Sequence, residues 1–184
     1  MTDPIDAIER SALWRKAAAY AARMHASHAR KDGRTPYFAH PARVAMTVRD
    51  TFGCDDPAAI AAAYLHDTIE DTPADYDDIE HRFGKDVADL VAALSKNMLL
   101  PEPEREADYD RRLAEADWRA RLVKLADVLD NAEDLHTRPD GNAPKTASRH
   151  AERMDRALAL AEHDDHESTR RAAIIVKAVR DRLG

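Results

Sequence analysis

The amino-acid sequence predicts an all-α fold in which residues 1–184 form one helical bundle. Alanine is abundant and only 5 glycines occur, and alanine is the best helix former while glycine is among the worst. Apolar residues recur at three- and four-residue steps, and no stretch shows the sustained period-two alternation of a half-buried strand. A chain of 184 residues has the usual length of one domain with its own core.

The first half of the chain is predicted to contain three long helices. Apolar residues spaced by three and four predict the first helix over Asp6–Arg30, and the polar segment 31–36 predicts a turn after it. Pro41 suits the first turn of a second helix near Ala42–Phe52. The strongly apolar run AAIAAAYLHDTIE predicts the third helix over Ala58–Glu70.

Two short helices and a loop are expected next. Tyr76–Phe83 is predicted to be a helix that ends at Gly84, because glycine readily adopts the conformation that ends helices. An apolar stripe predicts a helix over Asp86–Ser95. The charged segment Lys96–Asp108 carries two prolines, so we expect a surface loop there.

The last part of the chain again shows helical patterns. Asp110–Asn131 is predicted to be helical with a break near Asp117. A loop is expected over Arg138–Pro144, and two amphipathic helices over Thr146–Glu162 and Glu167–Leu183.

Charge and composition narrow the partners that we expect. A formal net charge of -7 argues against a nucleic-acid polymer, whereas a small phosphorylated ligand needs only a local group of Lys and Arg. The single cysteine, Cys54, excludes an intrachain disulfide and fits a reducing compartment. The chain shows neither the apolar core of a signal peptide nor a run of about 20 apolar residues. We therefore expect a cytoplasmic protein with no membrane partner, and no pattern specifies its oligomeric state.

Side chains of the kind that bind a divalent transition metal occur in three separate segments. They are His40 in PYFAHP, the adjacent pair His66 and Asp67 in AAYLHDTIED, and Asp127 in LVKLADVLDN. Two imidazoles with two carboxylates suit Mn²⁺, Fe²⁺ or Zn²⁺, whereas Mg²⁺ is typically bound by oxygen atoms alone. Ordinary explanations exist for single residues: His40 could cap a helix, and Asp127 could pair with Lys124 on the surface.

The pair His66 and Asp67 directly follows the apolar run Ile60–Leu65. Charged groups at the end of a buried helix cost several kcal/mol unless they are paired or bound to metal. On a helix, Glu70 lies one turn from His66, and Asp71 lies one turn from Asp67. We therefore expect two further carboxylates beside the metal ligands, where one of them could activate or position a water.

Polar residues near these segments could contact a substrate. Asn131 lies one helical turn beyond Asp127, so its amide could hold a water or a phosphoryl oxygen without adding charge. Arg30 and Lys31 form a basic pair at the end of the first predicted helix, which suits either the helix dipole or a substrate phosphate. We expect His25 on the same helix to be exposed and to bind no metal.

The motifs also stand in the order, and close to the spacing, of a known family. The run HARKDGRTPYFAHPARVA is followed by AAYLHDTIEDT and a later FG, and then by LVKLADVLDNAEDL. These segments resemble the hydrolase domain of the RelA/SpoT homologues, an HD domain, and in particular the short small alarmone hydrolases. The resemblance runs from about Ala17 to Leu135, and the later helices would complete the same fold.

This resemblance implies an HD-domain helical bundle with hydrolase activity. The implied reaction removes the 3′-pyrophosphate from (p)ppGpp or a related alarmone such as (p)ppApp, leaving GDP or GTP in the guanine case. The cofactor that it implies is Mn²⁺, and the implied ligands are His40, His66, Asp67 and Asp127. Glu70 and Asp71 match the pair that sets up the attacking water in the family. The expected substrate contacts are Arg30, Lys31, Asn131 and Lys124.

Departures from the family pattern leave other functions open. The family often has LADRLHN or LADKLYN where this chain has LADVLDN, so Val128 and Asp130 replace a basic residue and an aromatic or His residue. An extra acid at Asp130, near the phosphates, would alter the preferred base or phosphate count. One alternative is an HD phosphatase that acts on NADPH or on nucleoside monophosphates. Another is a metal-bound alarmone sensor without turnover.

Overall fold

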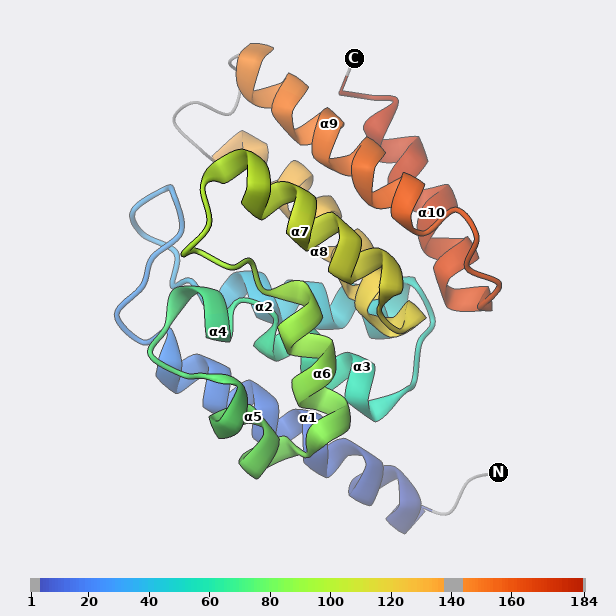
Figure 1. The fold of residues 1–184 in the computed structure, drawn as a ribbon. Coiled ribbons are helices and arrows are strands. Elements are labelled where there is room, and N and C mark those ends of the chain that lie inside the picture. The colour runs from blue at the N-terminus through green and yellow to red at the C-terminus, as the bar shows by residue number, and fades with distance from the viewer. Residues whose placement is uncertain (1–3, 138–143, 184) are drawn as a thin grey trace.

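Helices make up almost all of the regular structure in the computed structural model, which describes residues 4–137 and 144–183 (Figure 1). Within these ranges no strand forms, and an isolated antiparallel bridge joins Ala29 and Pro36. The predicted all-α fold is therefore confirmed. None of the described helices has the length and apolar character needed to cross a membrane.

The helices follow one another with short connections. In chain order they are α1 (Pro4–Met24), α2 (Ala39–Met46), α3 (Pro57–Leu65), α4 (Thr68–Asp71), α5 (Tyr76–Phe83), α6 (Lys85–Leu94), α7 (Glu102–Glu115), α8 (Trp118–Glu133), α9 (Pro144–Leu160) and α10 (Glu167–Arg180). A π-helical turn, η1 (Thr47–Thr51), continues α2, and a 3₁₀ turn, η2 (Asp134–Thr137), continues α8.

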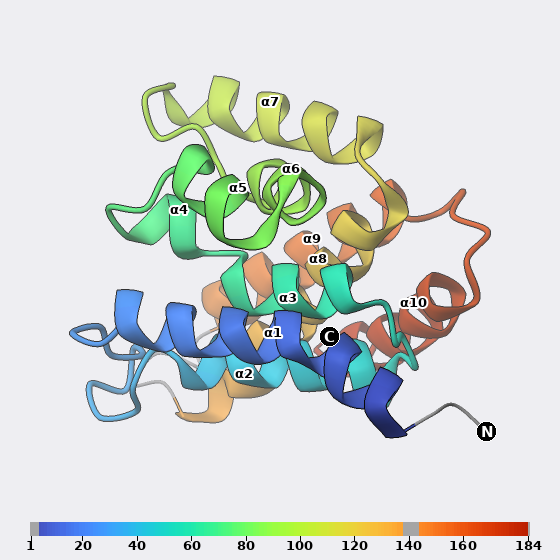
Figure 2. The ribbon, with the colours of Figure 1, turned by 90° about the horizontal axis from the view of Figure 1, so that it is seen from below.

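Helix α3 forms the centre of the bundle. Its residues Ala58–Ala63 and Leu65 are all buried, as expected of a helix that is apolar on every side. It packs against α1, α2, α6 and α8, and Figure 2 shows it between α1 and the layer of α5 and α6. The small alanine side chains let these neighbours approach closely, so the end of α3 lies deep inside the protein.

Helix α8 is the second central element. Its buried face includes Leu122, Leu125 and Ala126, and the helix packs against α2, α3, α9 and α10. Helices α9 and α10 lie side by side along it (Figure 1). Because α2, α3 and α8 contact one another, the histidines of the first two helices come close to the aspartates of the third.

The first helix is shorter than predicted: α1 ends at Met24 rather than at Arg30. The chain then turns back on itself, with Arg30 donating its backbone N–H to Thr35 and Tyr37 donating its backbone N–H to His28. These bonds, at 2.8 and 2.9 Å, form a small hairpin in place of the last helical turns. The hairpin lies next to the start of α2.

The second helix begins earlier than predicted, and the third is interrupted. Helix α2 starts at Ala39, so His40 lies within its first turn instead of preceding the helix. Helix α3 stops at Leu65, and α4 starts only at Thr68. The cause of the break lies in His66: its Nδ1 bonds the Ala63 carbonyl at 2.9 Å, which the backbone N–H of residue 67 would bind in a continuous helix.

The predicted loop over Lys96–Asp108 is wrong for its second half, because α7 already begins at Glu102. Pro101 occupies the position just before this helix and Pro103 lies in its first turn, where a missing N–H costs nothing. Glu102 and Glu104 also lie in this turn, where acids favour the helix dipole.

Most of the other expected elements are confirmed to within two or three residues. Helix α5 has the predicted bounds, and Asp117 caps α8 at the predicted break by accepting the N–H of Arg119 at 2.9 Å. Most of the loop expected over Arg138–Pro144 lies outside the described residues, and Pro144 itself is the first residue of α9.

Replacing Gly84 with alanine should lower the free energy of unfolding by roughly 1–3 kcal/mol. Gly84 joins α5 to α6 with φ of 86° and ψ of 161°, a conformation that residues with a Cβ strongly avoid. An added Cβ would meet no atom within 4 Å, so the cost would come from the backbone alone. Urea denaturation measures it, with Glu80→Ala on the exposed face of α5 as the control. Equal effects of both substitutions would contradict the requirement for glycine.

Candidate metal centre and its cavity

A cavity of about 320 Å³ opens beside the ends of α2 and α3 and the middle of α8. The predicted metal ligands and the two predicted acids all line it, and so do three of the four predicted substrate contacts. These residues are His40, His66, Asp67, Asp127, Glu70, Asp71, Lys31, Lys124 and Asn131. The structure therefore brings together segments that are up to 100 residues apart in the sequence, and Arg30 is the predicted site residue that does not line the cavity.

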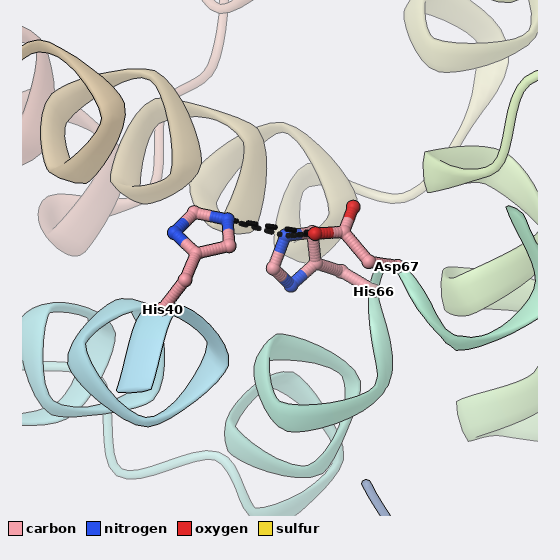
Figure 3. A group of neighbouring side chains, drawn as sticks. All are labelled: His40, His66 and Asp67. Atoms are coloured by element: carbon pink, nitrogen blue, oxygen red, sulfur yellow. Dashed lines mark hydrogen bonds and ion pairs between the residues drawn. The ribbon is translucent and has the colours of Figure 1, made fainter. Parts of the chain in front are cut away.

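Three donor atoms in the cavity lie close enough together for one metal ion, and a fourth lies beside them. His40 and His66 point their Nε2 atoms at each other at 3.2 Å, and Asp67 Oδ2 lies 3.5 and 3.1 Å from these two atoms (Figure 3). Asp127 Oδ1 lies 3.3 Å from His40 Nε2 and 3.9 Å from His66 Nε2. Donors bound at about 2.1 Å to one ion are separated by roughly 3.0–3.4 Å, and the spacings among His40, His66 and Asp67 are close to this range. Asp127 Oδ1 lies beside these three, nearest to His40 Nε2.

The hydrogen bond made by Nδ1 of each imidazole determines whether Nε2, which faces the cavity, has a free lone pair. The Ala63 carbonyl can only accept, so the neutral His66 ring carries its proton on Nδ1, the atom 2.9 Å away. Likewise His40 Nδ1 lies 2.7 Å from a carboxylate oxygen of Asp130 and donates to it. When both rings are neutral, two imidazole lone pairs and two carboxylates face one another, and such a set of acceptors favours a cation between them.

Electrostatics at these donors also favour a positive charge. Burial lowers the pKa of His40, but hydrogen bonds with Asp127 and Asp130 outweigh it and raise that pKa well above its usual value. Burial likewise lowers the pKa of His66, but the charge of Asp67, a hydrogen bond with Asp67 and the charge of Asp127 together raise that pKa above its usual value. In the absence of a metal ion, protons on the imidazoles balance the carboxylates, and a divalent ion would replace those protons.

Glu70 and Asp71 lie beside the four donors. Glu70 Oε2 accepts the backbone N–H of Lys96 at 2.9 Å, which fixes the side chain against the loop before α7. Burial raises the pKa of Glu70, and the charge of Asp67 raises it further. Burial also raises the pKa of the more exposed Asp71. A carboxylate with a raised pKa beside a metal centre can accept a proton from water near neutral pH.

The predicted contact residues differ in where they point. Lys124 Nζ lies 2.9 Å from Asp127 Oδ2, so the alternative ion pair does form, but on the cavity wall instead of on the surface. Asn131 donates to Asp127 Oδ1 at 2.6 Å and accepts from Arg30 at 3.1 Å. Arg30 also bonds Asp134 at 2.9 Å, so it lies behind Asn131 and supports it.

The expectation that Asp130 adds an acid near a substrate is wrong. Asp130 is buried and faces α2, where it bonds His40 Nδ1 at 2.7 Å and Arg43 at 2.9 Å. It does not line the cavity, because residue 130 lies on a different face of α8 from Asp127 and Asn131. A carboxylate that holds the outer nitrogen of a metal-binding histidine fixes the orientation of the ring and strengthens its donor atom.

We expect Asp130→Asn to weaken Mn²⁺ binding by about 10–100-fold, because an amide holds His40 less strongly than a carboxylate does. Isothermal titration of the metal-free protein measures this effect. Asp77→Asn, an exposed change on α5, is the control and should bind Mn²⁺ as the unmodified protein does. Equal affinity of both variants would contradict a role for Asp130 in orienting His40.

Sequence reasoning missed Tyr37 and misplaced His25. The Tyr37 hydroxyl donates to Asp67 at 2.6 Å and lies 3.2 Å from Asp71, so it ties a candidate metal ligand to a candidate acid. The buried ring of His25 stacks on Tyr37 at 4.8 Å, so the expected exposure of His25 is wrong. Only the place of Tyr37 three residues before His40 could have indicated its role, because the hairpin that turns it inward has no periodic pattern.

The sequence and the structure of this chain are similar to those of known proteins. Residues 17–154 match the family model of the HD domain. Guanosine-3′,5′-bis(diphosphate) 3′-pyrophosphohydrolase MESH1 of Xenopus tropicalis is 40% identical over 126 residues, 68% of this chain and 70% of that protein. The Homo sapiens protein of the same name is 40% identical over 122 residues, which cover 66% and 68% of the two chains.

A solved structure is similar over nearly the whole chain. It belongs to a metazoan ortholog of SpoT that hydrolyzes ppGpp and plays a role in starvation responses. The TM-score is 0.78 at 29% sequence identity, and the match covers 97% of this chain and 98% of the other. The similarity thus includes the end of α9 and α10, which follow the residues that the family model matches.

Proposed function

Because this chain belongs to the HD-domain family, we propose that it is a metal-dependent hydrolase that removes the 3′-pyrophosphate from guanosine-3′,5′-bis(diphosphate), ppGpp. The observation that carries the proposal is the close group of His40, His66 and Asp67, with Asp127 beside it and two further acids in the same cavity. Residues 1–184 act as one domain in this proposal, and the substrate is a small nucleotide.

The donor set fits a mononuclear Mn²⁺ site. His40, His66, Asp67 and Asp127 would hold the ion, and Fe²⁺ or Zn²⁺ would suit the same mixed nitrogen and oxygen donors. A bound divalent ion supplies Lewis-acid chemistry, in which it polarises a phosphoryl group and lowers the pKa of a water toward about 7.

Glu70 and Asp71 handle the proton in this reaction. The oxygen of one water bonds to the phosphorus next to the 3′ oxygen, the bond between that phosphorus and the 3′ oxygen breaks, and the 3′ oxygen takes up a proton to become a hydroxyl group. The products are GDP and pyrophosphate. Glu70 accepts a proton from the water, which its raised pKa favours. The backbone N–H of Lys96 donates to Oε2 of Glu70 and holds the side chain in place. Asp71, held by Tyr37, orients the water from the open side of the cavity.

Other residues bind and orient the nucleotide. Lys31 and Lys124 line the cavity with positive charge for the reacting phosphates, and the Asn131 amide adds a neutral polar group. Arg30 keeps Asn131 in place through its hydrogen bond at 3.1 Å. Lys124 is already paired with Asp127, a proposed metal ligand. Its positive charge is therefore shared between that carboxylate and a substrate phosphate.

Incubation of the metal-free protein with ppGpp, ppApp and NADPH, with and without Mn²⁺, tests the proposal. The expected result is conversion of ppGpp to GDP and pyrophosphate only when the metal is present. Release of orthophosphate instead would favour a phosphatase, and tight binding without products would favour a sensor. If ppGpp stays intact with Mn²⁺, the proposal is wrong.

A further inference from the structure

Four side chains of alternating charge run along the side of the cavity formed by α7 and α9. They are Lys96, Glu106, Arg156 and Asp110, and all four line the cavity. We refer to them as the α7–α9 charge chain. The successive ion pairs measure 2.6 Å from Lys96 to Glu106, 3.1 Å from Glu106 to Arg156 and 2.6 Å from Arg156 to Asp110.

The two acids of this chain pair with cations that line the cavity. Burial raises the pKa of Glu106, but hydrogen bonds and charges from Lys96 and Arg156 outweigh burial and keep that pKa below its usual value. Lys96 and Glu106 are only about a quarter exposed, at 22% and 27%, so water screens this pair incompletely. Lys96 and Arg156 are therefore neutralised by the protein before any ligand arrives.

This neutralisation matters because the 3′-pyrophosphate of a bound nucleotide would take up the charged groups around the metal donors. With a 3′-pyrophosphate at the metal donors, Lys124 is paired with Asp127 next to the same donors. The cations that remain on the α7 and α9 side for further phosphates are Lys96, Arg153 and Arg156. Each added phosphate there must compete with Glu106 and Asp110 for Lys96 and Arg156. Both carboxylates also repel the phosphate.

We propose that Glu106 and Asp110 set the number of phosphates that the cavity accepts, so that the protein favours nucleotides with few phosphates on the 5′ oxygen. This inference rests on the proposed function, because it takes the 3′-pyrophosphate to lie at the metal donors. The carboxylates act as counter-anions within the protein, because they lower the attraction of Lys96 and Arg156 for phosphate groups. This attraction is lowered more for a long polyphosphate than for a single phosphate.

A purely positioning role for the same acids makes a different prediction. If Glu106 and Asp110 only held Arg156 in place, their loss would weaken every substrate by a similar factor. If they act as counter-anions, their loss favours substrates in proportion to their phosphate count. Glutamine and asparagine keep the size and the hydrogen-bond acceptor of each side chain, so the substitutions change mainly the charge.

The test compares guanosine 3′-diphosphates that carry one, two or three phosphates on the 5′ oxygen. In Glu106→Gln and Asp110→Asn, kcat/KM for the triphosphate relative to the monophosphate should rise roughly threefold, mainly through KM, and by about tenfold in the double variant. The gain should shrink at high salt, because salt screens partly exposed charges. Glu115→Gln, an exposed acid at the end of α7, removes the same charge away from the cavity and should leave the ratio unchanged.

An unchanged ratio in the double variant, or an equal loss for all three nucleotides, would overturn the inference. Calorimetric binding of the same three nucleotides decides the question even without turnover. If the unmodified protein binds them with no hydrolysis, and the affinity ratio still shifts in the variants, the proposed function fails while the role of Glu106 and Asp110 stands.

Discussion

Asp67→Asn should lower kcat/KM for ppGpp by at least about a thousandfold, because it replaces a carboxylate donor of the metal centre with a neutral, weaker amide donor. The asparagine has the shape of the aspartate and can still accept from the Tyr37 hydroxyl, which lies 2.6 Å from Oδ2. The expected loss is therefore a loss of metal binding and not of packing. Steady-state assays at a Mn²⁺ concentration that saturates the unmodified protein measure it.

Thermal unfolding gives a readout for the same variant that does not depend on activity. A ligand that binds only the folded state raises the melting temperature, so Mn²⁺ should stabilise the unmodified protein and have little effect on Asp67→Asn. Asp50→Asn, which is exposed and far from the cavity, is the control and should respond to Mn²⁺ normally. Equal stabilisation of the Asp67 variant would show that Asp67 is not a ligand.

Glu70→Gln should reduce kcat by about 10²–10⁴-fold while Mn²⁺ affinity stays the same, because the amide cannot accept a proton from water. The glutamine oxygen can still accept the Lys96 N–H, which is bonded to Glu70 at 2.9 Å, so the loop should keep its place. Single-turnover assays separate the chemical step from binding, and metal titration supplies the second measurement.

Two outcomes would contradict this role of Glu70. Full turnover in Glu70→Gln would remove it as the base, and Asp71 would then be the remaining acid of the pair. Loss of Mn²⁺ together with activity would make Glu70 part of the metal centre. Glu80→Gln, an exposed change on α5, controls for the loss of one acid.

The parts of the fold that local pattern determines were predictable from the sequence. The apolar run before His66 predicted a buried helix, and α3 is the centre of the bundle. Gly84 predicted the end of α5 because its backbone conformation strongly favours glycine. Asp117 predicted the break between α7 and α8 because a side-chain oxygen can cap a helix start.

The differences arise where a side chain or a distant segment overrides that pattern. The imidazole of His66 takes a backbone carbonyl and interrupts a helix that periodicity alone would continue to Glu70. The hairpin after Met24 depends on bonds between residues 28–30 and 35–37, which leave no trace in helical spacing. The prolines before Arg105 are typical of a loop, but prolines also suit the first turn of a helix, and α7 begins there.

The candidate site shows the same division. The chemistry of His40, His66 and Asp67 pointed to a metal centre before any geometry was known, because imidazoles and carboxylates together are typical transition-metal ligands. The role of Asp130 could not be predicted, since it depends on how α8 is rotated against α2. Glu106 was likewise hidden, because its partner Arg156 is 50 residues away on another helix.

A crystal structure of the protein grown with Mn²⁺, with anomalous scattering measured for manganese, tests the central claim most directly. The predicted result is one anomalous peak about 2.0–2.3 Å from His40 Nε2, His66 Nε2, Asp67 Oδ2 and Asp127 Oδ1. A peak at another place, or no peak between these four atoms at saturating Mn²⁺, would contradict the account.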